Sequence, residues 1–150
     1  MKIRKTSTAI IVYDNKILFL KRDNIPTIVE PDKWQLPGGH IEKGETPITA
    51  LRRELVEEVS HAPSNLTFIG RLRDSSREVH IFWCYIDKDE TEKFKLGELE
   101  GQEMRFMSVD EALKRKLTMN VRFYLSTFKV LISKHLNKIT TPNIKEFLQR

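Results

Sequence analysis

The sequence predicts one α/β domain in which a mixed β-sheet is covered by helices on both faces. Segments that favour strands and helices follow one another in the order hairpin, strand, helix, strands, helix. The 150 residues are 39% hydrophobic and 31% charged, which is typical of a globular domain and excludes a fibrous or disordered chain.

The first third of the chain is expected to begin with a β-hairpin. Two β-rich runs, 6–13 and 17–21, are separated by Asp14-Asn15-Lys16, which is a turn signal. Residues 23–33 contain two prolines among mixed polar residues, so we expect a loop there. A short strand from Trp34 to Leu36 then leads into Pro37-Gly38-Gly39.

The segment 46–59 predicts a helix. Thr46 is a favoured N-cap residue and Pro47 suits the first helical position, whereas Pro63 prevents any continuation. An apolar stripe along the helix can pack against the sheet, and it consists of Ile48, Leu51, Leu55 and Val59.

The second half predicts further strands at 66–72 and 78–86. Ser108 and Glu111 form a capping box that opens a short helix. A longer amphipathic helix is expected from Asn120 to His135, and Thr141-Pro142 can cap a small terminal helix. The predicted organisation is one domain, residues 1–136, with a C-terminal extension of the same domain at 137–150.

A few features of the sequence indicate in which cellular compartment the protein lies. The single cysteine, Cys84, lies in an apolar run and predicts a buried, unreactive thiol. The apolar stretch after the basic N-terminus is too short for a signal peptide, and no run is long enough to cross a membrane. We therefore expect a cytoplasmic monomer or homodimer without a membrane partner.

Basic and acidic residues are unevenly distributed along the sequence. Residues 1–110 carry 17 Lys/Arg and 19 Asp/Glu, whereas residues 111–150 carry 9 and 2. A basic last quarter is suited to phosphates or nucleic acid, and a solvated basic helix face is the alternative.

Three carboxylates crowd one side of the predicted helix 46–59. Glu54, Glu57 and Glu58 span about 100° of its circumference at about 100° per residue. Arg53 can pair with Glu57, which leaves the other two unmatched. Hard oxygen ligands at this density suit Mg²⁺ or Mn²⁺, and a solvated acidic face is the alternative.

A glycine-rich turn precedes this helix. Gly38-Gly39 and Gly44 place flexible backbone near the helix N-terminus, where phosphate oxygens bind readily. The spacing from Gly39 to Gly44 also fits a P-loop, but a P-loop has Lys where Glu45 stands. An acid there would repel nucleotide phosphates, so the P-loop interpretation is excluded.

The turn and the helix together form a longer pattern. Gly39-x₅-Glu45-x₇-Arg53-Glu54-Leu55-x-Glu57-Glu58 resembles the Nudix box, GX₅EX₇REUXEEXGU, in which U is a bulky aliphatic residue. Trp34 to Gly39 and the segment Leu99 to Ser108 extend the likeness to the MutT-like branch. The resemblance implies the family's α/β/α sandwich and a Mg²⁺-dependent hydrolase acting on a diphosphate linkage, with Mn²⁺ as the other possible ion.

The sequence departs from the box at its last two positions, which hold Ser60 and His61. The family glycine ends the helix in a left-handed conformation, so Ser60 is expected to strain that end by about 1 kcal/mol. The carboxylates are unaffected.

The resemblance also implies roles for single residues. The metal ligands would be the Gly38 carbonyl, Glu54, Glu57 and Glu58, with Glu54 also a candidate general base. Glu45 would pair with Arg53 and orient the loop against the helix. Glu100 would supply a fourth acidic ligand, with Glu103 as the alternative. Gly39 and Arg22 would contact the substrate, although a surface charge explains Arg22 equally well.

The substrate is less well defined by the sequence. Asn120 matches the position at which MutT-like proteins read an oxidised guanine, and an ordinary helix N-cap is the alternative. Aromatic side chains can stack on a base or belong to the core, namely Phe82, Trp83, Phe123 and Tyr124. We expect a nucleoside triphosphate, such as 8-oxo-dGTP, to yield a monophosphate and pyrophosphate. The alternatives are a nucleotide sugar, a dinucleotide polyphosphate, a capped RNA end, or a non-catalytic nucleotide-binding regulatory module.

Overall fold

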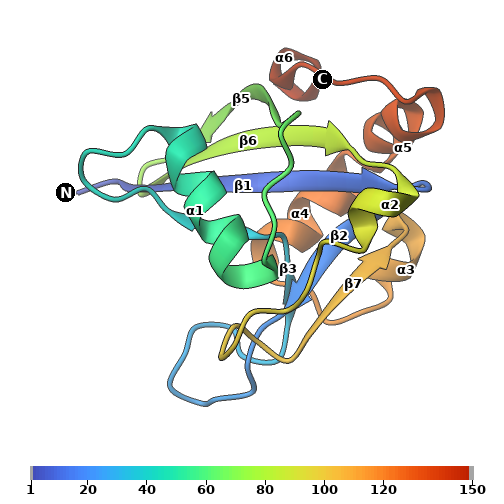
Figure 1. Cartoon of the computed structure of the whole chain (residues 1–150). Coiled ribbons are helices and arrows are strands. Elements are labelled where there is room, and N and C mark those ends of the chain that lie inside the picture. The colour runs from blue at the N-terminus through green and yellow to red at the C-terminus, as the bar shows by residue number, and fades with distance from the viewer. Residues whose placement is uncertain (1, 149–150) are drawn as a thin grey trace.

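Seven strands of the computed structural model, which describes residues 2–148, form one mixed sheet (Figure 1). The strands are β1 (Arg4–Tyr13), β2 (Lys16–Lys21), β3 (Trp34–Gln35), β4 (Gly38–His40), β5 (Thr67–Arg73), β6 (Arg77–Tyr85) and β7 (Glu103–Met107). The sheet order is β3-β2-β1-β6-β5, with β4 paired to β1 and β7 paired to β2. Strands β1 and β6 pair in parallel and the other strand pairs are antiparallel, so the sheet is mixed, as predicted.

Six helices accompany these strands in the described part of the chain. They are α1 (Pro47–Val59), α2 (Lys88–Thr91), α3 (Val109–Leu113), α4 (Met119–Thr127), α5 (Lys129–Lys138) and α6 (Ile144–Leu148). None of the helices within residues 2–148 is long and apolar enough to cross a membrane.

The predicted N-terminal hairpin is confirmed. Strands β1 and β2 pair antiparallel, with Tyr13 opposite Lys16. Asp14 and Asn15 between them both have positive φ, 49° and 61°. Two successive residues of this kind form the tight turn whose twist matches that of the flanking strands, and Asp and Asn tolerate it better than most residues.

Two apolar layers lie on opposite faces of the sheet because side chains alternate along each strand. Ile11 packs with the apolar stripe of α1, whereas the next residue, Val12, packs with α4 and α5. Figure 1 shows α1 and α4 on opposite sides of β1 and β6. Phe82 and Trp83 are buried, one in each layer, so for these two the core interpretation is right and base stacking is excluded.

The prediction of one long helix from Asn120 to His135 is wrong, because two helices, α4 and α5, occupy this segment. Phe128 has φ −110° and ψ 20°, which interrupts the helix between α4 and α5. Its ring packs edge-on against Phe147 of α6, with centroids 5.0 Å apart. The pattern of apolar residues did not indicate this interruption at Phe128, where the side chain packs against the terminal helix.

Helix α1 ends at Ser60, which adopts the left-handed conformation expected at this position, with φ 67° and ψ 6°. Its backbone N–H donates to the Val56 carbonyl at 3.1 Å. Its hydroxyl donates to the Lys95 carbonyl at 2.9 Å, a contact that a glycine cannot make. The serine thus offsets part of its backbone strain with a hydrogen bond to the following loop.

Replacing Ser60 separates these two contributions. Ser60→Ala keeps the strain and loses the hydrogen bond, so we expect its free energy of unfolding to fall by about 1 kcal/mol. Ser60→Gly also loses the bond but relieves about 1 kcal/mol of strain, so it should remain close to the wild type. Urea unfolding of the three proteins measures this, and equal destabilisation of both variants would contradict the strain argument.

Candidate active site

Helix α1 is anchored at its start and along one face. The Thr46 hydroxyl accepts from the Thr49 N–H at 3.3 Å, as its N-cap role predicts, and the Ser7 hydroxyl of β1 donates to the Pro47 carbonyl at 2.7 Å. The predicted apolar stripe lies against the sheet, with Leu51, Leu55 and Val59 fully buried. Because this face is fixed, the glutamates of α1 are directed toward β4 and its flanking loops.

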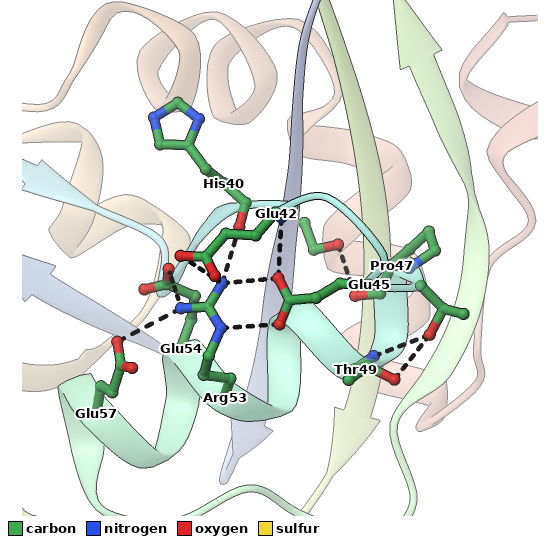
Figure 2. A network of polar contacts seen from close by, with 10 residues as sticks. His40, Glu42, Glu45, Pro47, Thr49, Arg53, Glu54 and Glu57 are labelled. Atoms are coloured by element: carbon green, nitrogen blue, oxygen red, sulfur yellow. Dashed lines mark hydrogen bonds and ion pairs between the residues drawn. The ribbon is translucent and has the colours of Figure 1, made fainter.

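Arg53 is the centre of a network that connects α1 to the preceding loop (Figure 2). Its guanidinium donates two hydrogen bonds to the Glu45 carboxylate, at 2.8 and 2.9 Å, and one to the His40 carbonyl at 3.1 Å. On its other side it contacts Glu54 at 3.0 Å and Glu57 at 3.6 Å. One arginine therefore holds the loop and sets the positions of two carboxylates.

The Glu45–Arg53 pair is bidentate, which is the strongest geometry for such a pair. Hydrogen bonds from Arg53, and from the Glu42 N–H, lower the pKa of Glu45 to about 2. Glu45 therefore stays ionised at physiological pH and orients the loop.

Glu58 is the most buried of the three glutamates, with 7% of its surface exposed. Its carboxylate accepts a hydrogen bond from the Gly38 N–H at 2.8 Å. Burial, with further contributions from Glu54, Glu100 and Glu57, raises its pKa to about 8. Four carboxyl groups therefore influence one another, which disfavours negative charge at this place unless a cation is close.

Gly38 and Gly39 lie so close to neighbouring atoms that a larger residue would not fit at either position. A Cβ on Gly39 would lie 2.5 Å from the carboxyl carbon of Glu54, and one on Gly38 would lie 2.1 Å from the Ser7 carbonyl oxygen. Gly38 also has φ 138°, which other residues rarely adopt. The backbone of β4 can thus run against both the glutamates and β1.

Glu100 joins the glutamates from a distant part of the sequence. Burial, and the charges of Glu57 and Glu54, raise its pKa. Its loop is tied to the end of α1, because the Gly97 N–H donates to the Glu58 carbonyl at 2.8 Å. A Cβ on Gly97 would lie only 2.0 Å from the Glu57 carbonyl oxygen, so no larger residue fits there without movement.

A cleft of about 500 Å³ opens beside the carboxylates. It is lined by most of the residues expected to be functional, namely Arg22, Gly38, Gly39, Glu54, Glu58, Glu100 and Asn120. Glu57 is not among the lining residues, but its charge contributes to the raised pKa of Glu58 and of Glu100. Glu103 lies on β7, where it pairs with Arg105 at 2.7 Å, and does not line the cleft.

Arg22 and Asn120 approach the cleft with their positions set by neighbours. Arg22 donates to the Gln35 side chain at 2.9 Å and to the Val29 carbonyl at 3.0 Å. The N-cap interpretation of Asn120 is wrong, because the N-cap of α4 is Thr118 and Asn120 is the second helical residue. Its side-chain oxygen instead accepts a hydrogen bond from Arg77, so Asn120 faces the cleft.

Several residues at the site were not found from the sequence. Arg4 and Arg77 line the cleft from neighbouring strands, and Gly97 positions the Glu100 loop. Strand register brings Arg4 and Arg77 together, and no local motif marks either residue. A lone glycine in a polar loop likewise carries no signal of a close approach.

The donor set is suited to a hard divalent cation. The carboxyl groups influence one another there, and burial raises the pKa values of Glu54, Glu58 and Glu100, a penalty that a cation would remove. Within residues 2–148 no three His, Cys, Asp or Glu side chains already stand as a preformed metal cage. Mg²⁺ commonly needs only one or two carboxylates, with water and substrate phosphates completing its shell.

The fold and this glycine-lined acidic cleft define the class of protein. Solved structures with the same fold include a MutT NUDIX hydrolase from Burkholderia pseudomallei, with TM-score 0.67 and 24% identity over 84% of this chain and 98% of that one. The E. coli ORF135 protein matches with TM-score 0.61 and 28% identity, covering 87% of this chain and 91% of its own.

Sequence comparison gives the family. The NUDIX domain family matches residues 3–127, and the chain belongs to this family. The prediction made from the box, a Nudix protein of the MutT-like branch, is confirmed. An RNA pyrophosphohydrolase of Halorhodospira halophila is 38% identical over 60 residues, which are 40% of this chain and 30% of that relative.

Proposed function

We propose that the protein is a Mg²⁺-dependent hydrolase that cleaves a diphosphate linkage in a nucleotide. With a nucleoside triphosphate the products would be a nucleoside monophosphate and pyrophosphate. The observation that carries the proposal is that Glu54, Glu58 and Glu100 line one open cleft, in which Glu58 accepts from the Gly38 N–H and Glu54 lies against Gly39. A merely solvated acidic face would not bury Glu58 beside other carboxylates.

The proposed metal ligands are Gly38 through its carbonyl, Glu54, Glu57, Glu58 and Glu100. Glu100 is preferred to Glu103 because Glu103 is paired with Arg105 outside the cleft. When bound, Mg²⁺ lowers the pKa of an attacking water and neutralises charge on the phosphate oxygens.

The side chains have separate tasks in this chemistry. Water attacks phosphorus, its oxygen forms the new P–O bond, and the bridging oxygen leaves with the electron pair of the broken bond. Glu54 is the candidate acceptor of the water proton, since burial raises its pKa and so strengthens it as a base. Arg53 and Glu45 fix the positions of the loop and of Glu54, while Arg22 and the Gly39 backbone face the substrate phosphates.

Two substrate classes are each favoured by a particular observation. Asn120 lines the cleft with its amide and can exchange hydrogen bonds with a purine edge, which favours a nucleoside triphosphate such as an oxidised purine nucleotide. The similarity to an RNA pyrophosphohydrolase, together with the basic last quarter of the chain, favours a 5′-phosphorylated RNA end. Nucleotide sugars and dinucleotide polyphosphates share the diphosphate and belong in the same test.

The proposal predicts turnover that depends on a divalent metal. A panel of nucleoside triphosphates, oxidised purine triphosphates, nucleotide sugars, dinucleotide polyphosphates and triphosphorylated RNA would be incubated with Mg²⁺ or Mn²⁺. Chromatography would then detect the products of diphosphate cleavage, such as a nucleoside monophosphate or a 5′-monophosphorylated RNA. At least one compound should be hydrolysed, EDTA should abolish its hydrolysis, and added Mg²⁺ should restore it. Absence of turnover throughout would reject the enzyme and favour the non-catalytic nucleotide-binding module.

A further inference from the structure

Two arginines lie side by side at one end of the cleft. Arg4 of β1 and Arg77 of β6 are register partners in the parallel pair of strands. Both side chains line the 500 Å³ cleft and also an adjoining hollow of about 200 Å³. Like charges directly opposite each other on neighbouring strands are destabilising, so this arrangement is unfavourable without an anion.

Neither guanidinium is neutralised by an acid within residues 2–148. Arg4 contacts the His40 ring nitrogen at 3.2 Å, and Arg77 donates to the Asn120 side-chain oxygen. The Asp74 carboxylate lies near Arg77 but accepts from the backbone N–H groups of Ser76 and Arg77, and it forms no ion pair with the guanidinium. Both arginines therefore keep donors available for a ligand.

The next pair of opposite residues along β1 and β6 does not carry like charges. Lys5 lies opposite Glu78, so this register pair carries opposite charges, and the Glu78 carboxylate is also paired with His80 and Arg71. This pair does not line the cleft. The uncompensated like-charged pair is thus the one that faces the cleft.

Acidic residues are unevenly distributed along the cleft. The 500 Å³ part is lined by both arginines and by Asp23, Glu30, Glu54, Glu58 and Glu100, whereas none of the Asp or Glu residues within 2–148 lines the adjoining 200 Å³ hollow. That hollow is bordered by Arg4, Arg77, Gln35, Thr118, Asn120 and Tyr124. A substrate held at the acidic end by its diphosphate would therefore extend toward two guanidinium groups that have no acidic partner within residues 2–148.

We propose that Arg4 and Arg77 form an anion site for a substrate phosphate that lies outside the scissile diphosphate. This inference rests on the proposed function, since the acidic end defines where the diphosphate lies. Paired guanidinium groups suit a phosphate because each presents two parallel N–H donors. Two sources fit this chemistry, namely a phosphate on the 3′ side of the ribose, as in RNA, and the terminal phosphate of a triphosphate.

Equilibrium binding with Mg²⁺ present tests the site without requiring turnover. One pair of probes is adenosine 5′-monophosphate and adenosine 3′,5′-bisphosphate, which differ by the 3′-phosphate. The second pair is the diphosphate and triphosphate of adenosine with a methylene group between the α and β phosphorus atoms, which prevents hydrolysis there. In at least one pair the added phosphate should tighten binding tenfold or more, and the responding pair identifies the source.

The variants Arg4→Gln and Arg77→Gln should each reduce this tenfold ratio to about twofold or less. Lys5→Gln is the matched control, because it removes the same charge from the neighbouring residue and should keep the ratio. Thermal unfolding of each variant establishes that the fold is intact. A ratio near one in both pairs for the wild type, or an unchanged ratio in both arginine variants, would overturn the anion site. Absence of turnover in the substrate panel leaves these binding ratios measurable, so the two failures are distinguishable.

Discussion

Glu57→Gln is expected to lower kcat by about 10²-fold or more while leaving the free energy of unfolding nearly unchanged. The substitution keeps the shape of the side chain and removes the negative charge proposed to hold the metal. The Glu57 side chain is 50% exposed and its contact with Arg53 is long, at 3.6 Å, so its contribution to stability is small. Activity and stability should therefore separate in this variant.

The measurement is kcat at saturating Mg²⁺ on the best compound of the panel, alongside urea unfolding. Glu92→Gln is the matched control, since Glu92 is an exposed glutamate just after α2 and, unlike Glu57, does not contribute to the raised pKa values of Glu54, Glu58 and Glu100. It removes the same charge and should behave as the wild type. Undiminished turnover by Glu57→Gln would remove Glu57 from the proposed metal site.

Gly97→Ala should lower kcat/KM by about 10- to 100-fold, although Gly97 contacts no substrate in the proposed mechanism. Its added Cβ would lie 2.0 Å from the Glu57 carbonyl oxygen, which belongs to the helix backbone and cannot turn away. The loop must therefore move, and the hydrogen bond from the Gly97 N–H to the Glu58 carbonyl is strained. Glu100 moves with the loop, away from Glu54 and Glu57, whose charges influence it.

The Mg²⁺ dependence of Gly97→Ala distinguishes displacement of Glu100 from a general loss of stability. The concentration of Mg²⁺ required for half-maximal activity should rise in Gly97→Ala, because a proposed ligand is displaced. The neighbouring substitution Glu98→Ala alters an exposed side chain in the same loop and should leave that concentration unchanged. If Gly97→Ala needs no more Mg²⁺ than the wild type, the positioning role of Gly97 is refuted.

The sequence predicted correctly those turns and helix ends whose conformation depends on a few adjacent residues. The turn at Asp14-Asn15 and the start of α1 at Thr46-Pro47 follow from backbone preferences of a few adjacent residues. The left-handed end at Ser60 was inferred from the family pattern and is present. Three of the candidate cleft residues, Gly39, Glu54 and Glu58, were found for the same reason, since the box places them at fixed spacing within one loop and one helix.

Predictions failed where a distant segment decides the conformation. Asn120 is a favoured N-cap residue, yet α4 begins earlier, and the Met119 N–H is satisfied by the Glu30 carboxylate at 2.8 Å. The long helix is divided at Phe128, whose ring packs on Phe147 of α6. Strand β7 was not anticipated, because its residues become a strand by pairing with β2, some 85 positions earlier in the chain.

The sequence by itself determined the family, the acidic helix and the reaction class that this helix suggests, because these depend on residue types at fixed short spacing. The tertiary structure decided which distant residues join the helix where the sequence left a choice or gave no signal. Glu100, and not the alternative Glu103, lies in the cleft because the Gly97 backbone fits against the last turn of α1. Arg4 and Arg77 meet because β1 and β6 pair in parallel in one register. Such contacts depend on strand pairing and backbone packing over long separations, which local preferences do not encode.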